Sequence, residues 1–156
     1  MARRTYENQT IRVVWDSTLC IHEGTCLREG AGVFDVGRRP WVDLDRADVD
    51  TVVAAVEGCP SGALRYERLD GGPEERSSVP TTVVPLPRGP LAVRGDLRIL
   101  DSDGGVFLVG PRATLCRCGA SANQPFCDLS HRRVRFTDSP RAPRDDAESP
   151  ADVGPG

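Results

Sequence analysis

The first half of the chain carries two short apolar runs on either side of a helical pattern. Residues 11–15, Ile-Arg-Val-Val-Trp, and residues 63–67, Ala-Leu-Arg-Tyr-Glu, each predict a strand. Residues 46–57 predict a helix with Asp45 as its N-cap, because apolar residues recur there at the spacing of one helix face. The residues of this face are Val49, Val52, Val53 and Val56. Valine is a modest helix former, so packing against the strands must stabilise the helix.

The second half predicts short β-strands and no long helix. Apolar runs occur at residues 91–93, 97–100 and 106–109, and Asp-Ser-Asp-Gly-Gly at residues 101–105 predicts a hairpin turn between the last two. Residues 134–136 predict a further closing strand. These patterns together indicate an α+β fold with a β-rich C-terminal half.

Segments rich in glycine, proline and charge divide the chain. We expect a first domain at residues 10–68, a linker at 69–87, a second domain at 88–137 and a disordered tail at 138–156. Each domain has a small apolar core, so each is expected to depend on a metal centre for folding.

Composition narrows the class of protein. The chain has six cysteines, and its N-terminal residues carry no apolar signal-peptide core, so we expect a cytoplasmic protein with reduced, metal-binding thiols rather than disulfides. No apolar run reaches membrane-spanning length, so no membrane association is expected. All 20 basic residues are arginine, and the net charge of −3 argues against nucleic-acid binding.

The most informative segment is residues 116–131, which contain three cysteines and a histidine. Cys116, Cys118, Cys127 and His131 are four soft or borderline ligands. That number suits a tetrahedral zinc site or one 2Fe–2S cluster. The four residue types alone do not distinguish a zinc site from a 2Fe–2S cluster.

The spacing C-x-C-x2-S-x3-P-x-C-D-x-S-H resembles the CDGSH (NEET-type) iron–sulfur domain. The residues that match, besides the four ligands, are Ser121, Pro125, Asp128 and Ser130. The resemblance implies a 2Fe–2S cluster with Cys116 and Cys118 on the inner iron, and Cys127 and His131 on the outer iron. Leu129 stands where the family has glycine. Either this position takes a positive φ, which leucine resists, or Asp128 caps a short helix whose first residue is Leu129.

A second set consists of Cys20, Cys26 and Cys59, the last followed by proline. The pattern C-x-H-x-G-x-C with a distant C-P-S-G-A-L resembles divergent mono-cluster ferredoxins. The resemblance implies a ferredoxin-like N-terminal half with a 3Fe–4S cluster, or a 4Fe–4S cluster with one non-cysteine ligand. Glu23 occupies the position of the missing cysteine, and His22 is a further candidate ligand. Structural zinc or inert thiols are the alternatives.

These assignments predict an iron–sulfur cluster-binding protein rather than an enzyme, with a role in one-electron transfer or in redox or iron–sulfur sensing. The alternatives are a donor of 2Fe–2S clusters to apo-proteins and a zinc-stabilised binding module without redox activity. A redox partner protein is expected, and a homodimer is one option. Arg117, Arg132 and Arg133 flank the second site and either dock an acidic partner or form solvated surface.

Overall fold

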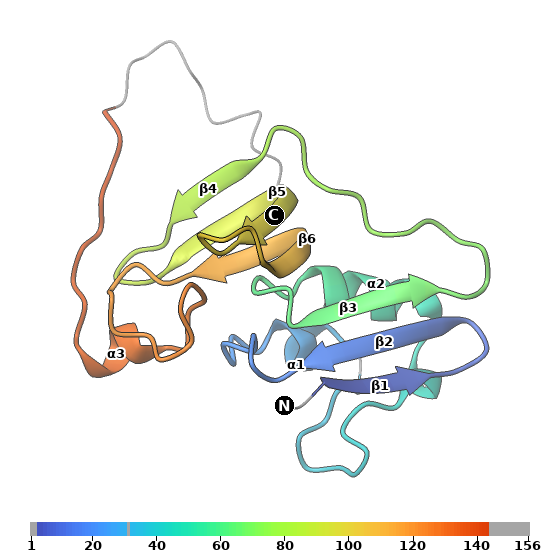
Figure 1. Cartoon of the computed structure of the whole chain (residues 1–156). Coiled ribbons are helices and arrows are strands. Elements are labelled where there is room, and N and C mark those ends of the chain that lie inside the picture. The colour runs from blue at the N-terminus through green and yellow to red at the C-terminus, as the bar shows by residue number, and fades with distance from the viewer. Residues whose placement is uncertain (1–2, 31, 144–156) are drawn as a thin grey trace.

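A computed structural model describes residues 3–30 and 32–143 of the chain. The first module is an antiparallel sheet of order β1-β2-β3, formed by Arg3–Glu7, Ile11–Asp16 and Leu64–Arg68. Three helical segments lie between β2 and β3 in the sequence. They are α1 (Thr25–Glu29), the 3-10 turn η1 (Leu44–Arg46) and α2 (Val49–Glu57). Figure 1 shows α2 packed behind this sheet.

The core of the first module lies between the sheet and α2. Ile11 and Val13 alternate inward on β2, and Val52 and Val56 meet them from α2, all fully buried. The predicted strands and helix are therefore present, and the valine face of the helix packs as expected.

The helix begins later than predicted, because a different aspartate caps it. The side chain of Asp48 accepts a 2.9 Å hydrogen bond from the backbone N–H of Thr51, which is the geometry of an N-cap. Asp45 instead lies within the 3-10 turn, where its carboxylate accepts from the side-chain amide of Asn8. The predicted cap at Asp45 was wrong for this reason.

Strand β1 was not predicted, because its residues Arg-Arg-Thr-Tyr-Glu lack apolar alternation. It pairs with β2 along its whole length, from Arg3 opposite Asp16 to Glu7 opposite Arg12. Ion pairs stabilise the pairing at both ends, between Arg3 and Asp16 and between Arg12 and Glu7.

The second module is an antiparallel sheet of order β4-β5-β6, formed by Thr82–Pro85, Leu91–Leu100 and Val106–Leu115. The predicted short runs merge into the two long strands β5 and β6, with a register shift between Arg94 and Leu97. Strand β4 lies within the segment expected to be a linker. The turn at residues 101–105 forms as predicted, with the Asp101 carboxylate accepting from the backbone of Asp103 and Gly105.

The chain beyond the cysteine loop departs from the prediction. Residues 134–136 do not form a strand but follow the short helix α3 (Ser130–Arg133) as a turn, in which Phe136 donates a backbone hydrogen bond to His131. Residues 138–143 have no helix or strand, and the remainder of the predicted disordered tail, 144–156, lies outside the described residues.

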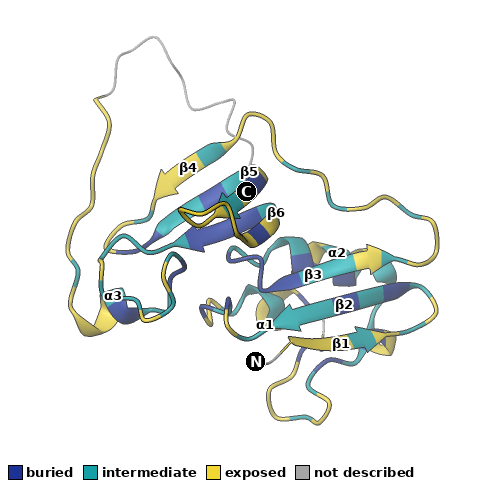
Figure 2. Cartoon of the chain, viewed as in Figure 1, coloured by how far each residue is buried: buried dark blue, intermediate teal, exposed yellow. Residues whose placement is uncertain are grey.

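The two modules share an apolar cluster at their junction. Leu19 and Ala63 of the first module pack with Leu108 and Phe126 of the second, and all four are buried. In Figure 2, by contrast, β1, β4 and the segment after α3 are mostly exposed. Within residues 3–30 and 32–143, no helix has the length and apolar character needed to cross a membrane.

Candidate metal centres

The four predicted ligands of the second module lie in two close pairs. Sγ of Cys116 is 3.8 Å from Sγ of Cys118, and Sγ of Cys127 is 3.5 Å from Nδ1 of His131. Two thiolates on one tetrahedral metal lie about 3.8 Å apart, and a thiolate and an imidazole nitrogen about 3.5 Å, given the usual bond lengths to zinc. Each pair therefore has the spacing of two ligands on one metal ion.

Backbone pairing brings the two halves of this loop together. The N–H of Cys116 donates to the carbonyl of Pro125 at 2.8 Å, and the N–H of Cys127 donates to the carbonyl of Thr114 at 3.0 Å. The loop thus returns antiparallel to the end of β6. The motif serine Ser121 fixes the turn, because its hydroxyl donates to the carbonyl of Phe126 and accepts from the N–H of Asn123.

The left-handed conformation predicted for the glycine position occurs at Leu129, which has a φ of 71°. Leu129 is the N-cap residue of α3 and not its first helical residue, so the alternative prediction was wrong. The carboxylate of Asp128 accepts from the backbone N–H groups of Ser130 and Ala122, both at 2.9 Å. These bonds hold the backbone around Leu129 and the start of α3, which carries His131.

The protein environment acts differently on the thiols of this site. Burial raises the pKa of Cys116, but hydrogen bonds from the N–H groups of Ser121 and Gly119 outweigh it, so its pKa is lowered overall. The side chain of Gln124 also donates to its sulfur at 3.2 Å. Burial raises the pKa of Cys127, although the N–H of Leu129 donates to its sulfur at 3.4 Å. Hydrogen bonds to sulfur are a means of adjusting the potential of an iron–sulfur cluster.

The three cysteines of the first module surround a cavity of about 420 Å³. Cys20 follows β2, Cys26 lies on α1, and Cys59 follows Gly58, the C-cap residue of α2. Burial, with the neighbouring Cys59 and Cys20 sulfurs adding to it, raises the pKa of Cys26 to about 11. A metal that binds here must therefore displace a firmly held proton. Trp15 and Trp41 line the same cavity and pack against each other.

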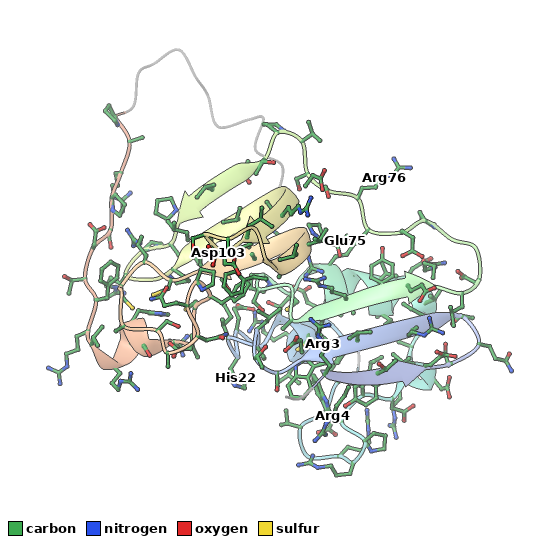
Figure 3. All side chains as sticks on the ribbon, in the orientation of Figure 1. Arg3, Arg4, His22, Glu75, Arg76 and Asp103 are labelled. Carbon is green, nitrogen blue, oxygen red and sulfur yellow. The ribbon has the colours of Figure 1, made fainter. Side chains whose placement is uncertain are left out.

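Glu23 lines the same cavity, but neighbouring groups already bind its carboxylate. It accepts from the backbone N–H and hydroxyl of Thr25 and forms an ion pair with Arg28 at 2.9 Å. Nδ1 of His22 is 3.8 Å from Sγ of Cys20, and His22 is exposed and extends away from the ribbon in Figure 3. The arrangement does not support Glu23 in the place of the missing cysteine.

In the described part of the chain, no three side chains of His, Cys, Asp and Glu converge closely enough to hold a single metal ion. The second module has two pairs of ligands, and the first has three thiols around a cavity.

Sequence reasoning missed the part played by two arginines. The guanidinium of Arg117 donates to Asp138 and to the carbonyls of Leu86 and Gly89. It also lies over the ring of Phe136. Arg117 is therefore already bound within the chain and is not available to dock a partner protein. Arg112 is buried and reaches the first module. An arginine at an inward position of an apolar strand was the available signal, because buried charge requires partners.

Two known protein families match separate parts of the chain. The family model for a divergent 4Fe-4S mono-cluster matches residues 6–69, and the model for an iron-binding zinc finger of CDGSH type matches residues 88–132. The chain is 41% identical over 63 residues to the protein YjdI, described as uncharacterized, of Escherichia coli K12. The same identity is found with YjdI of Escherichia coli O157:H7. Each alignment covers 40% of this chain and 83% of the relative.

Proposed function

Because the chain belongs to the divergent 4Fe-4S mono-cluster family and carries a CDGSH-type iron-binding domain, we propose that it is a two-centre electron carrier. One electron at a time passes between the two modules of the same chain and then to a partner protein. The protein is a carrier and not an enzyme in this proposal.

The paired ligands support a 2Fe–2S cluster in the second module. Cys116 and Cys118 would hold the inner iron, and Cys127 and His131 the outer iron, since each pair has the spacing of ligands on one metal. Three thiols around a cavity of about 420 Å³ support a 3Fe–4S or 4Fe–4S cluster in the first module, held by Cys20, Cys26 and Cys59. When bound, such clusters supply one-electron redox chemistry.

The observation that carries the proposal is that one apolar cluster borders both ligand sets. Cys20 and Cys59 of the first module pack against the cluster that contains Phe126. Phe126 directly precedes the ligand Cys127, and Leu115, which also packs there, directly precedes Cys116. These side chains join the two proposed ligand sets through one packed apolar cluster.

Ligand chemistry suggests the direction of transfer. Histidine ligation raises the potential of a 2Fe–2S cluster relative to ligation by cysteine alone. The first module, with cysteine ligands, is therefore proposed as the donor and the second as the acceptor. Arg132 and Arg133 are exposed beside His131, so an acidic redox protein is the proposed partner at this end.

Anaerobic purification followed by iron and sulfide analysis, with potentiometric electron paramagnetic resonance, tests the proposal. Wild type should show two centres of different potential. Cys59→Ser should remove only the N-terminal signal and Cys127→Ser only the C-terminal one, and electrons placed on the first centre should appear on the second. Zinc in both sites would refute the proposal. Rapid loss of the 2Fe–2S cluster to an apo-ferredoxin, without electron exchange, would favour a cluster donor.

A further inference from the structure

Arg112 of β6 extends its side chain out of the second module and into the first. Its guanidinium donates to the carbonyls of Val56 at 2.8 Å, of Leu64 at 3.2 Å and of Cys59. Nε and Nη2 also donate to the two carboxylate oxygens of Glu75, at 2.7 and 2.8 Å. Figure 3 shows Glu75 between β6 and β3. A residue of the second module therefore binds the backbone of a proposed cluster ligand of the first.

The arginine of this ion pair is buried, and the glutamate is half-buried. The side chain of Arg112 is 1% exposed and that of Glu75 is 14% exposed. Charge taken out of water is tolerated only when it is paired and hydrogen-bonded, and the guanidinium meets both conditions. The carbonyls of Val56 and Cys59 also lie at the C-terminal end of α2, where the helix dipole favours a positive charge.

The loop that carries Cys59 is held by Arg112 from two directions. The guanidinium binds the carbonyl of Cys59, and Gly62, three residues later, packs against the main chain of Arg112. A Cβ atom at Gly62 would lie 2.6 Å from the carbonyl oxygen of Arg112. The position of this ligand loop thus depends on a strand of the other module.

We propose that the Arg112–Glu75 pair sets the reduction potential of the centre held by Cys59, with Arg112 as the positioning residue for that ligand. The inference rests on the two-centre function proposed above. Reduction adds negative charge to the centre. A nearby positive charge therefore favours the reduced form, and a nearby negative charge opposes it, most strongly in a buried setting of low dielectric constant. The balance between Arg112 and Glu75 then determines the net effect.

Redox titration of the full-length, cluster-loaded protein tests the inference. Glu75→Gln removes the negative charge and should shift the reduction potential of the N-terminal centre upward. Arg112→Met removes the positive charge and should shift the same potential downward. Arg112→Lys keeps the positive charge, so its potential should return most of the way to the wild-type value. The C-terminal potential should stay unchanged throughout. A purely structural role would lower thermal stability without shifts of opposite sign. If Arg112→Met does not fold, Glu75→Gln decides alone.

Glu67→Gln is the matched control, because Glu67 forms an exposed ion pair with Arg12 on the first sheet. It should shift neither potential. With both centres loaded, an unmoved N-terminal potential in Glu75→Gln would overturn this inference and leave the proposed function standing. A wild-type protein without a redox-active N-terminal centre would overturn both.

Discussion

The side-chain amide of Asn123 donates a 2.7 Å hydrogen bond to the backbone carbonyl of Thr18, which lies 105 residues earlier in the chain. Asn123 lies in the loop between Cys118 and Cys127, and Thr18 lies two residues before Cys20. The bond thus joins the loops that carry the two ligand sets. It adds a polar contact to the apolar cluster at the same junction.

Asn123→Ala should weaken this junction. Loss of one such bond costs about 1 kcal/mol of unfolding free energy, so the midpoint of thermal unfolding should fall modestly, and electron exchange between the centres should slow. Asn123→Asp should destabilise more, because a carboxylate cannot donate and would face a carbonyl oxygen. Thermal unfolding followed by circular dichroism distinguishes the variants, and equal midpoints in all three proteins would contradict the prediction.

Leu129→Gly should retain the C-terminal cluster and bind it at least as firmly as wild type. A non-glycine residue in the left-handed region costs about 1–2 kcal/mol, and Leu129 has a φ of 71°. Leu129→Val should lose iron from this site, because β-branching resists the same conformation more strongly. Iron content and visible absorption after gel filtration provide the measurement. Equal iron retention in Val and Gly variants would mean that backbone conformation here does not limit assembly.

Gly62→Ala should separate the two modules. Gly62 has a φ of 69°, which costs alanine about 1–2 kcal/mol, and the clash with the carbonyl of Arg112 adds roughly 1–3 kcal/mol. Gly71→Ala is the control, because Gly71 has a φ of 78° but open space around it. Chemical denaturation should show a larger loss of stability at position 62, together with loss of the N-terminal cluster. Equal losses at the two positions would exclude the close approach as the cause.

The ion pair at the end of β3 predicts a pH dependence of stability. Hydrogen bonds from Arg68 and from the N–H of Gly72 hold the pKa of Asp70 at about 2. Since the unfolded value is about 4, this group stabilises the fold fully above pH ~4, and the contribution disappears as pH falls towards ~2. The stability difference between wild type and Asp70→Asn should therefore shrink across that interval, measured by urea unfolding. A constant difference from pH ~6 to ~2.5 would contradict it.

Local sequence determined much of this protein. The spacing of residues 116–131 predicted the second proposed ligand set, and one loop does bring these residues into two close pairs. The valine face of α2 and the strands at residues 11–15 and 63–67 followed from periodicity, and the turn at 101–105 from its glycines and aspartates. Spacing and the resemblance carried by Cys59-Pro60 also predicted the first proposed ligand set, whose three cysteines line one cavity.

Features that depend on contacts between distant parts of the chain could be seen only in the tertiary structure. Strand β1 is polar and forms because β2 offers a free edge. Asp48, and not Asp45, caps α2, because Asn8 engages Asp45 from another part of the chain. Arg112 illustrates the same limit most clearly. Its five oxygen partners come from α2, the Cys59 loop, β3 and the segment before β4, and no periodicity records such contacts. Only the packed modules show that one strand holds the ligand loop of the other.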